Sequence, residues 1–310
     1  IDGRRGQGLF RKRGRSCFTR TCCKPGGHQH NTSVGWHYHK GLSLNKSRYA
    51  VLGDPVDHSL SPQIHQEFAR QANFSLAYEK IHCASGNFDR TLKRFFLEGG
   101  SGANITLPHK GRAAKWVDRV AGIAELAGAV NTIVKREDFF EGYNTDGIGL
   151  KRDLKNRGFN ALGKKVLVLG AGGAARGTVA FLAQESPEIV VIANRTHEKG
   201  EHLAERMRSY FPEEQIFAVP LSGMALDFDL IINATSAGIE GKQVLLDGAV
   251  AAGAFCYDLF YSQNRRKLTP FCEWAIDSGA NQAIDGLGML VEQAAESFYL
   301  WTGYRPDGKD

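Results

Sequence analysis

No stretch of this sequence contains the run of about 18 apolar residues that a membrane-crossing helix needs, because Gly, Asn or charged residues interrupt the longest candidates. We therefore expect neither a transmembrane segment nor a membrane partner. The start of the chain also lacks the apolar core of about 7 to 15 residues that marks a secretory signal. Of the six cysteines, three lie in the first 47 positions, and the other three, Cys83, Cys256 and Cys272, are far apart in the sequence. We interpret these three as reduced, partly buried thiols, which is typical of a cytoplasmic protein.

Acidic residues are almost absent from the first 47 positions, which contain ten Lys and Arg residues but only Asp2 as an acid. The rest of the chain contains 29 basic and 32 acidic residues, so its body is not basic although the net charge is +6. The Cys and His residues of the first 47 positions match no tetrahedral zinc spacing, so we expect no metal. We interpret residues 1–47 as a basic tail that is disordered or not native. An arm that binds a metal or a nucleic acid is the alternative, but we expect no nucleic-acid partner for the body.

The remaining sequence alternates strand-like apolar runs with helical patterns, which is typical of a parallel sheet covered by helices. We predict an α/β fold, and the length of 310 residues favours two domains. One helix should begin at Ser61-Pro62, with Ser61 as its N-cap. Strands are predicted at residues 49–52, 77–81, 103–106, 130–134, 139–143, 165–169, 189–193, 216–219, 230–233 and 255–259. Further helices are predicted at residues 88–97, 118–127 and 287–301.

A glycine-rich sequence, Gly170-Ala-Gly-Gly-Ala-Ala175, follows an apolar strand directly and opens a helix. Gly170 permits a tight turn, Gly172 lets the backbone approach a pyrophosphate, and Ala175 is small enough for packing between helix and strand. A plain glycine turn is the alternative, but strand, glycines, helix and strand occur in the order of a dinucleotide site. We therefore predict a Rossmann-type domain whose helix N-terminus binds the cofactor phosphates. The residues expected there are Gly170, Ala171, Gly172, Gly173 and Ala174.

The end of the next strand distinguishes NADP from NAD. Sites for NAD commonly place Asp or Glu at this point, to accept hydrogen bonds from the ribose 2′-hydroxyl. Here the strand ends in Asn194, Arg195 and Thr196, and Lys199 follows one turn later. Two positive charges and a hydroxyl suit a 2′-phosphate, although they could also be a solvated helix start. We predict that NADP is the cofactor.

Lys110 and Asp146 are the candidates for acid–base chemistry, because hydride transfer to a ketone needs a group that handles the proton on its oxygen. Lys110 follows a predicted strand at the edge where open α/β sheets bind ligands. Asp146 lies in the polar turn Asn144-Thr-Asp-Gly147 between the two halves of the chain. Taken alone, Lys110 could be a surface residue and Asp146 a helix cap. We treat them as a coupled pair.

The ordered motifs of the chain resemble those of the shikimate dehydrogenase family from about Arg48 to Trp301. The motifs are Gly53-Asp-Pro55, His58-Ser-Leu-Ser-Pro62, Asn104-Ile-Thr-Leu-Pro-His-Lys110, Gly128-Ala-Val-Asn-Thr132, Asn144-Thr-Asp-Gly147, the glycine sequence with Arg176, Asn194-Arg-Thr196, Asn233-Ala-Thr-Ser236, Tyr257-Asp-Leu-Phe-Tyr261 and Asp285-Gly-Leu-Gly-Met-Leu290 with Gln293. His109 is a departure, since some members have an apolar aromatic residue there.

The resemblance implies an enzyme that uses NADPH to reduce 3-dehydroshikimate to shikimate, in the synthesis of aromatic amino-acid precursors. It implies that Lys110 protonates the nascent alkoxide, and that Asp146 holds the Lys110 ammonium and a substrate hydroxyl. The residues that it places around the substrate are Ser59, Ser61, Asn104, Thr106, Asn131, Tyr261 and Gln293. It adds Thr235, Gly286 and Met289 to the cofactor site.

These expectations give a substrate domain made of residues 48–145 and 286–310, an NADP domain of residues 146–285, and an active site in the cleft between them. The protein would be a monomer or a homodimer. A quinate or shikimate dehydrogenase of broader cofactor use, including NAD, is the closest alternative. A catalytically silent dinucleotide sensor is another, and the presence of both Lys110 and Asp146 argues against it.

Overall fold

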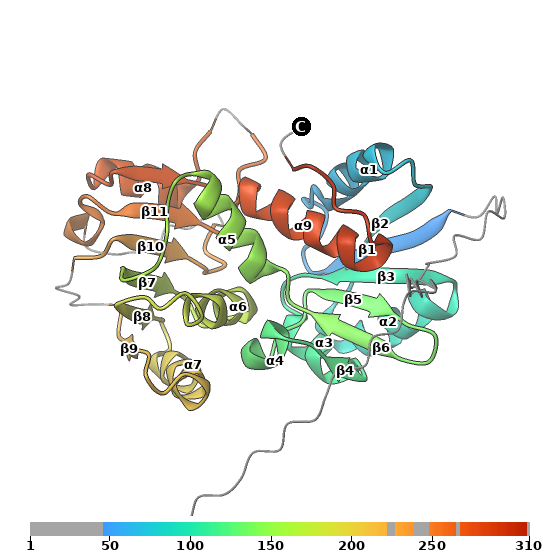
Figure 1. Ribbon diagram of the computed structural model, residues 1–310, viewed down its shortest axis with the longest axis horizontal. Helices are drawn as coiled ribbons and strands as arrows, with labels where there is room; N and C mark the ends of the chain where they lie inside the picture. Colours follow the sequence, from blue (N-terminus) through green and yellow to red (C-terminus); the bar gives the residue numbers. More distant parts are fainter. Residues whose placement is uncertain (1–45, 222–226, 239–247, 265–266, 309–310) are drawn as a thin grey trace, which may run out of the picture. The chain divides into compact units, whose positions relative to one another are not determined.

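A computed structural model describes residues 46–221, 227–238, 248–264 and 267–308 of the chain. The strands that it describes form two six-stranded sheets, each with helices packed against it (Figure 1). The strands are β1 (Ser47–Gly53), β2 (Leu76–His82), β3 (Gly100–Ile105), β4 (Arg119–Val120), β5 (Thr132–Lys135), β6 (Phe140–Tyr143), β7 (Lys165–Leu169), β8 (Ile189–Ala193), β9 (Ile216–Val219), β10 (Leu230–Asn233), β11 (Phe255–Asp258) and β12 (Gln282–Ile284). The helices are α1 (Ser61–Gln71), α2 (Phe88–Leu97), α3 (Lys110–Trp116), α4 (Ile123–Ala127), α5 (Asp146–Asn156), α6 (Gly173–Leu182), α7 (His197–Tyr210), α8 (Pro270–Asp277) and α9 (Leu287–Thr302), with 3-10 turns η1 (Ser85–Asn87) and η2 (Gly248–Ala251).

The first sheet has the strand order β2-β1-β3-β5-β6-β4. Its strands β1, β2 and β3 are parallel, as the alternation of strands and helices predicts. Strand β5 runs antiparallel to both β3 and β6. Strands β5 and β6 are joined by a short charged turn, and so short a connection can only join antiparallel neighbours.

The second sheet has the order β12-β11-β10-β7-β8-β9 and is parallel throughout. Its central strand β7 is covered on both faces, and Val166 through Leu169 are fully buried, as the uninterrupted apolar run predicts. The strand order reverses direction between β7 and β10. Ligands of open α/β sheets bind outside the carboxyl ends of the strands at such a switch point.

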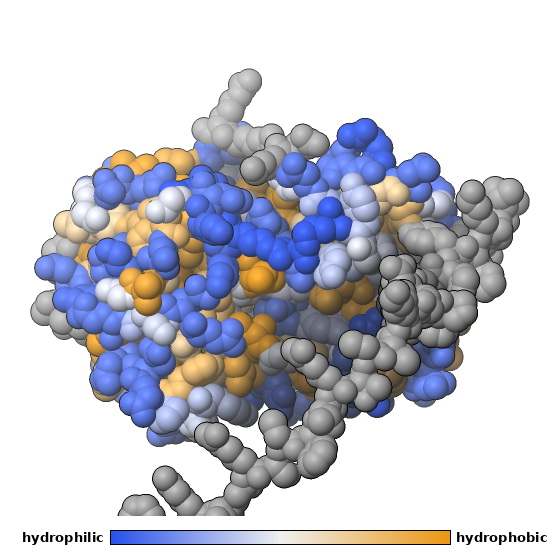
Figure 2. Space-filling view, in the orientation of Figure 1, coloured by the Kyte–Doolittle hydropathy of each residue, from blue (hydrophilic) through white to orange (hydrophobic). Residues whose placement is uncertain are grey.

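Helices α5 and α9 lie side by side between the two sheets (Figure 1). The outward side of α5 is hydrophilic (Figure 2), as expected for exposed residues such as Lys151 and Lys155. Helix α9 also packs on α1 and on the first sheet, and Trp301 Nε1 donates a hydrogen bond of 3.0 Å to the Ile133 carbonyl. The end of the chain therefore completes the core of its first half.

The structure confirms the α/β fold and every predicted strand, with shifts of a few residues at the ends. Two helix predictions were wrong in detail. Ser61 is the first residue of α1 and Leu60 is its N-cap, so Ser61 does not cap the helix. The helix predicted at 118–127 forms only in its second half: Arg119–Val120 are strand β4, Gly122 has a φ of +57°, and α4 follows it. Helices α3, α5, α7 and α8 and strands β4 and β12 were not predicted.

Residues 1–45 of the predicted tail lie outside the described residues. Within the described ranges, no helix is both long enough and apolar enough to cross a bilayer.

Candidate active site

Lys110 and Asp146 form a hydrogen-bonded ion pair, with 2.6 Å between Lys110 Nζ and Asp146 Oδ2. Lys110 is the first residue of α3, just beyond the carboxyl end of β3, and Asp146 is the first residue of α5, just beyond β6. Their side chains are only 14% and 7% exposed, so water screens the two charges weakly. The structure therefore brings together the two residues that the sequence nominated for acid–base chemistry.

The Asp146 carboxylate is held in one orientation by polar groups around it. Asn131 Nδ2 donates to Asp146 Oδ1 at 2.9 Å and also to Thr145 Oγ1 at 2.9 Å. The backbone N–H of Asp146 donates to Asn144 Oδ1 at 3.1 Å. Lys110 donates a hydrogen bond to one carboxylate oxygen and Asn131 donates to the other, so the orientation of the carboxylate is fixed.

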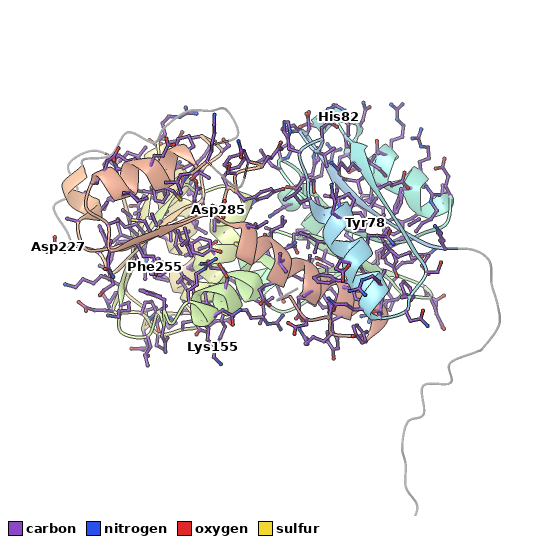
Figure 3. The ribbon with its side chains drawn as sticks, turned by 90° about the horizontal axis from the view of Figure 1, so that it is seen from above. Tyr78, His82, Lys155, Asp227, Phe255 and Asp285 are labelled. Atoms are coloured by element: carbon purple, nitrogen blue, oxygen red, sulfur yellow. The ribbon has the colours of Figure 1, made fainter. Side chains whose placement is uncertain are left out.

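Asn104 lies in the same network and is held through both ends of its amide. Tyr78 donates its hydroxyl proton to Asn104 Oδ1 at 2.7 Å, and Asn104 Nδ2 donates to Ser297 Oγ at 3.0 Å. Burial raises the pKa of Tyr78 and keeps its hydroxyl protonated, so it remains a donor. His65 stacks on the Tyr78 ring with 4.5 Å between ring centroids, and burial lowers the pKa of His65 to about 3, so its imidazole is neutral. Tyr78 lies in the first-sheet half of the molecule (Figure 3).

Gln293 reaches this network from α9. Its Oε1 accepts from Asn131 Nδ2 and from Thr145 Oγ1, each at 3.4 Å. Ser297, one turn further along α9, joins Asn104 to Thr132 and Thr145 through its hydroxyl. The sequence analysis missed Ser297 and Tyr78. The spacing of four residues between Gln293 and Ser297 puts both on one helix face and was the available signal for Ser297.

The two serines of the first loop are close together and lie beside Tyr261. Ser59 Oγ donates to Ser61 Oγ at 3.1 Å, and the Leu60 backbone N–H donates to the Tyr261 hydroxyl at 3.4 Å. Tyr261 follows β11 of the second sheet, so these contacts join the two halves of the chain. Thr106 lies against Gly53 but makes no side-chain hydrogen bond to the other predicted substrate residues within the described ranges.

The glycine sequence forms a tight loop between β7 and α6. Gly170 has a φ of +105°, which only glycine adopts readily, and a methyl group on it would lie 3.1 Å from the Ala234 carbonyl oxygen and 3.4 Å from Thr235 Cγ2. A methyl group on Gly172, the N-cap of α6, would meet no atom within 4 Å. The loop is thus open at the helix N-terminus, where a pyrophosphate would bind.

The predicted 2′-phosphate residues follow the neighbouring strand β8, whose last residue Ala193 pairs with Leu169 of β7. Arg195, Thr196 and Lys199 are exposed at the start of α7, and Asn194 Nδ2 donates to the Thr196 carbonyl at 2.6 Å. Within the described residues, neither Arg195 nor Lys199 is in an ion pair. Their charges are thus available to an anion at this edge of the sheet.

Gly286 and Met289 lie at the same edge. Gly286 is the N-cap of α9, and a methyl group on it would lie 2.6 Å from the Leu259 carbonyl oxygen. The Met289 backbone N–H donates to the Tyr257 hydroxyl at 3.2 Å. Asp285, beside the start of α9, is labelled in Figure 3. Within the described residues, no group of three or more His, Cys, Asp or Glu side chains could bind a metal ion.

Asp258 is a fully buried carboxylate at the end of β11, where its Oδ1 accepts from Asn233 Nδ2 at 2.9 Å and Oδ2 has no partner among the described residues. Burial raises the pKa of Asp258 from 3.8 to about 6. Between these two values the folded protein binds more protons than the unfolded chain, so stability falls as pH rises from about 4 to about 6. We expect this carboxyl to lower the free energy of unfolding by roughly 3 kcal/mol across that window.

Urea unfolding of wild type and Asp258→Asn between pH 4 and pH 7 tests this prediction. The amide carries no charge at any of these values, so the stability of Asp258→Asn relative to wild type should increase with pH. Asp227→Asn, at an exposed position, is the control and should follow the wild-type profile. Parallel profiles for wild type and Asp258→Asn would contradict the prediction.

Comparison with known proteins identifies the family. Three family models match the chain: the shikimate dehydrogenase substrate binding domain over residues 51–133, shikimate / quinate 5-dehydrogenase over residues 153–249, and the shikimate 5'-dehydrogenase C-terminal domain over residues 286–307. A curated relative from Alkalilimnicola ehrlichii, named shikimate dehydrogenase (NADP(+)), is 47% identical over 262 residues, which cover 84% of this chain and 95% of the relative. This chain belongs to the shikimate dehydrogenase family.

Solved structures of similar proteins extend the match to three dimensions. An Ael1 enzyme from Pseudomonas putida is 39% identical with a TM-score of 0.76, covering 84% of this chain and 95% of that one. A shikimate 5-dehydrogenase from Thermus thermophilus, solved with NADP(H) and shikimate, is 34% identical with a TM-score of 0.73 and the same two coverages. Lys110 lies within the region matched by the substrate binding domain model, and the glycine loop lies within the region matched by the shikimate / quinate 5-dehydrogenase model. Asp146 lies between these two matched regions.

Proposed function

We propose that this chain catalyses the reversible, NADPH-dependent reduction of 3-dehydroshikimate to shikimate, within the synthesis of aromatic amino-acid precursors. The observation that carries the proposal is the buried pair of Lys110 and Asp146, which lies against the glycine loop. A methyl group on Gly173 of that loop would lie 3.2 Å from Lys110 Cβ. The acid–base pair therefore lies beside the loop that would bind the cofactor.

The groups around the pair suit a small polyhydroxylated acid. Asn104, Asn131 and Gln293 are buried amides that can exchange hydrogen bonds with ring hydroxyls. The hydroxyls of Ser59, Ser61 and Tyr261 can donate to a carboxylate. A ligand held at both ends by such groups has one orientation in the site, which reduces the entropy lost in reaching the transition state.

Lys110 is the group that manages the proton. When bound, NADPH supplies a hydride to the carbonyl carbon, and negative charge then develops on the oxygen. The Lys110 ammonium stabilises that oxygen and donates a proton to it. Asp146 keeps the ammonium in place through the 2.6 Å hydrogen bond and can accept a hydrogen bond from a substrate hydroxyl. In the reverse direction the same pair accepts the proton from the alcohol.

The charges at the start of α7 support NADP over NAD. Arg195 and Lys199 can pair with a 2′-phosphate, and the sequence offers no carboxylate at the end of β8 for a ribose 2′-hydroxyl. The opening at Gly172 and the N-terminus of α6 suit the pyrophosphate.

We assign residues 48–145 and 286–310 to a substrate domain and residues 146–285 to a cofactor domain, with the active site between them. The packing of α9 on the first sheet supports the assignment of the C-terminal helix. We place the reaction in the cytoplasm, since Cys83, Cys256 and Cys272 are buried free thiols.

Absorbance at 340 nm tests the function directly. Purified protein is mixed with either shikimate or quinate and with either NADP or NAD, which gives four combinations of substrate and cofactor. We expect rapid reduction of NADP with shikimate and little with the other three pairs. Comparable rates with quinate and NAD would favour the broader-specificity alternative, and no activity with any pair would contradict the proposal.

A further inference from the structure

Gly173 is not required to be glycine by the dinucleotide fingerprint or by its own backbone. The fingerprint needs small residues at 170, 172 and 175, and 173 lies between the last two. Its φ is not in the left-handed region that favours glycine, unlike that of Gly170. The atoms around residue 173 give a further reason for a glycine at this position.

That reason is the stem of Lys110. A methyl group on Gly173 would lie 3.2 Å from Lys110 Cβ, 3.5 Å from Cδ and 3.7 Å from Cγ. The shortest of these contacts is to Cβ, which is bonded to the backbone of α3 and cannot move without that helix. A side chain at 173 would therefore displace the first turn of α3 by a few tenths of an ångström, together with Lys110.

A second glycine, on α3, faces a side chain of α6, but the atom that it faces is flexible. A methyl group on Gly111, the neighbour of Lys110, would lie 2.8 Å from Arg176 Nη2 of α6. That atom is the tip of a long side chain and can turn aside. The two helix starts thus approach each other through two glycines, and of these only Gly173 faces an atom that is bonded directly to the backbone of the other helix.

We propose that Gly173 is a positioning residue for Lys110, in addition to its place in the cofactor loop. The proposal rests on the proposed function, because it assumes that Lys110 is the proton-transferring group. By lacking a side chain, Gly173 lets the start of α3 lie against the start of α6. The amine of Lys110 then reaches both Asp146 and the reacting oxygen. Substitution at 173 is therefore expected to change the chemical step more than cofactor binding.

The test compares three glycine-to-alanine variants by kcat, KM and the dissociation constant for NADPH, measured from its fluorescence. Gly173→Ala should lower kcat about tenfold, since a misplacement of about 1 Å can cost about a hundredfold, while the dissociation constant changes less than about threefold. Gly172→Ala, which fills the open approach to the pyrophosphate, should instead weaken NADPH binding. Gly111→Ala should leave kcat within about twofold of wild type. Thermal unfolding of each variant establishes that it is folded.

A double-mutant cycle shows whether Gly173 acts through Lys110. In a Lys110→Ala background, Cβ is retained but the amine is absent, so adding Gly173→Ala should change the residual rate less than about twofold. An equal loss of kcat in both backgrounds would overturn the proposal, as would a Gly173→Ala variant that weakens NADPH binding with kcat intact. Wild-type activity with shikimate and NADP is measured alongside. A failure of this inference is then distinct from a failure of the proposed function.

Discussion

Replacing Lys110 with alanine is expected to lower kcat by at least about a hundredfold, the usual scale for loss of an acid–base group. The substitution removes the proton donor and leaves the buried Asp146 carboxylate without its cation. The KM for shikimate should change much less, because the serines, amides and Tyr261 that would hold the substrate remain. Steady-state kinetics with shikimate and NADP measure both quantities.

Lys115→Ala is the matched control for this substitution. Lys115 lies on the same short helix, α3, but its side chain is exposed. Its loss should leave kcat and KM close to the wild-type values. Wild-type turnover in Lys110→Ala would remove Lys110 from the mechanism, whereas a loss of turnover in both variants would point to damage to α3.

Replacing Arg195 with alanine is expected to lower kcat/KM for NADP by about 10- to 100-fold. A hydrogen bond to a charged group contributes about 1.5–3 kcal/mol, and each 1.4 kcal/mol corresponds to a factor of about ten. The same substitution should change kcat/KM for NAD by less than about threefold, because NAD carries no phosphate on its 2′-oxygen. Initial rates with each cofactor at saturating shikimate measure the two values.

Lys155→Ala provides the control, since Lys155 is an exposed residue of α5 (Figure 3) and is not expected to touch the cofactor. It should not alter the ratio of NADP to NAD activity. An equal loss with both cofactors in Arg195→Ala would mean that Arg195 supports the fold or binds a part that the cofactors share.

Local patterns predicted most of the strands and nominated Lys110 and Asp146, and the family resemblance then decided between the alternatives for this pair. The run Lys165 to Leu169 is apolar because β7 is covered on both faces, and the glycines that follow it open a helix in the order typical of a dinucleotide site. Lys110 follows β3 and Asp146 follows β6, and these two strands run in the same direction on either side of β5, so their carboxyl ends lie at one edge of the sheet. The sequence could therefore nominate both residues, and the structure brings them to 2.6 Å.

The parts that were missed depend on contacts between distant segments. Tyr78 is one aromatic residue on an ordinary strand, and only the fold puts its hydroxyl beside Asn104. Ser61 looked like a helix cap, but α1 begins one residue early and Ser59 accepts the Ser61 backbone N–H. The role of Gly173 depends on the approach of α3 to α6, which no spacing along the chain reveals.

The packing of α9 on the first sheet has a consequence for synthesis of the protein. Trp301 packs against Tyr49 with 4.6 Å between ring centroids, and its hydrogen bond to Ile133 spans 168 residues of sequence. A ribosome adding about 5–20 residues per second needs roughly 10 to 30 s to make that length. During this interval the first half has left the ribosome with the apolar surface around Phe68 and Leu76 still uncovered, because their partner Phe298 does not yet exist. The packing around β1 and α1 therefore cannot be completed until α9 has been made, and chaperones can bind this surface throughout that interval.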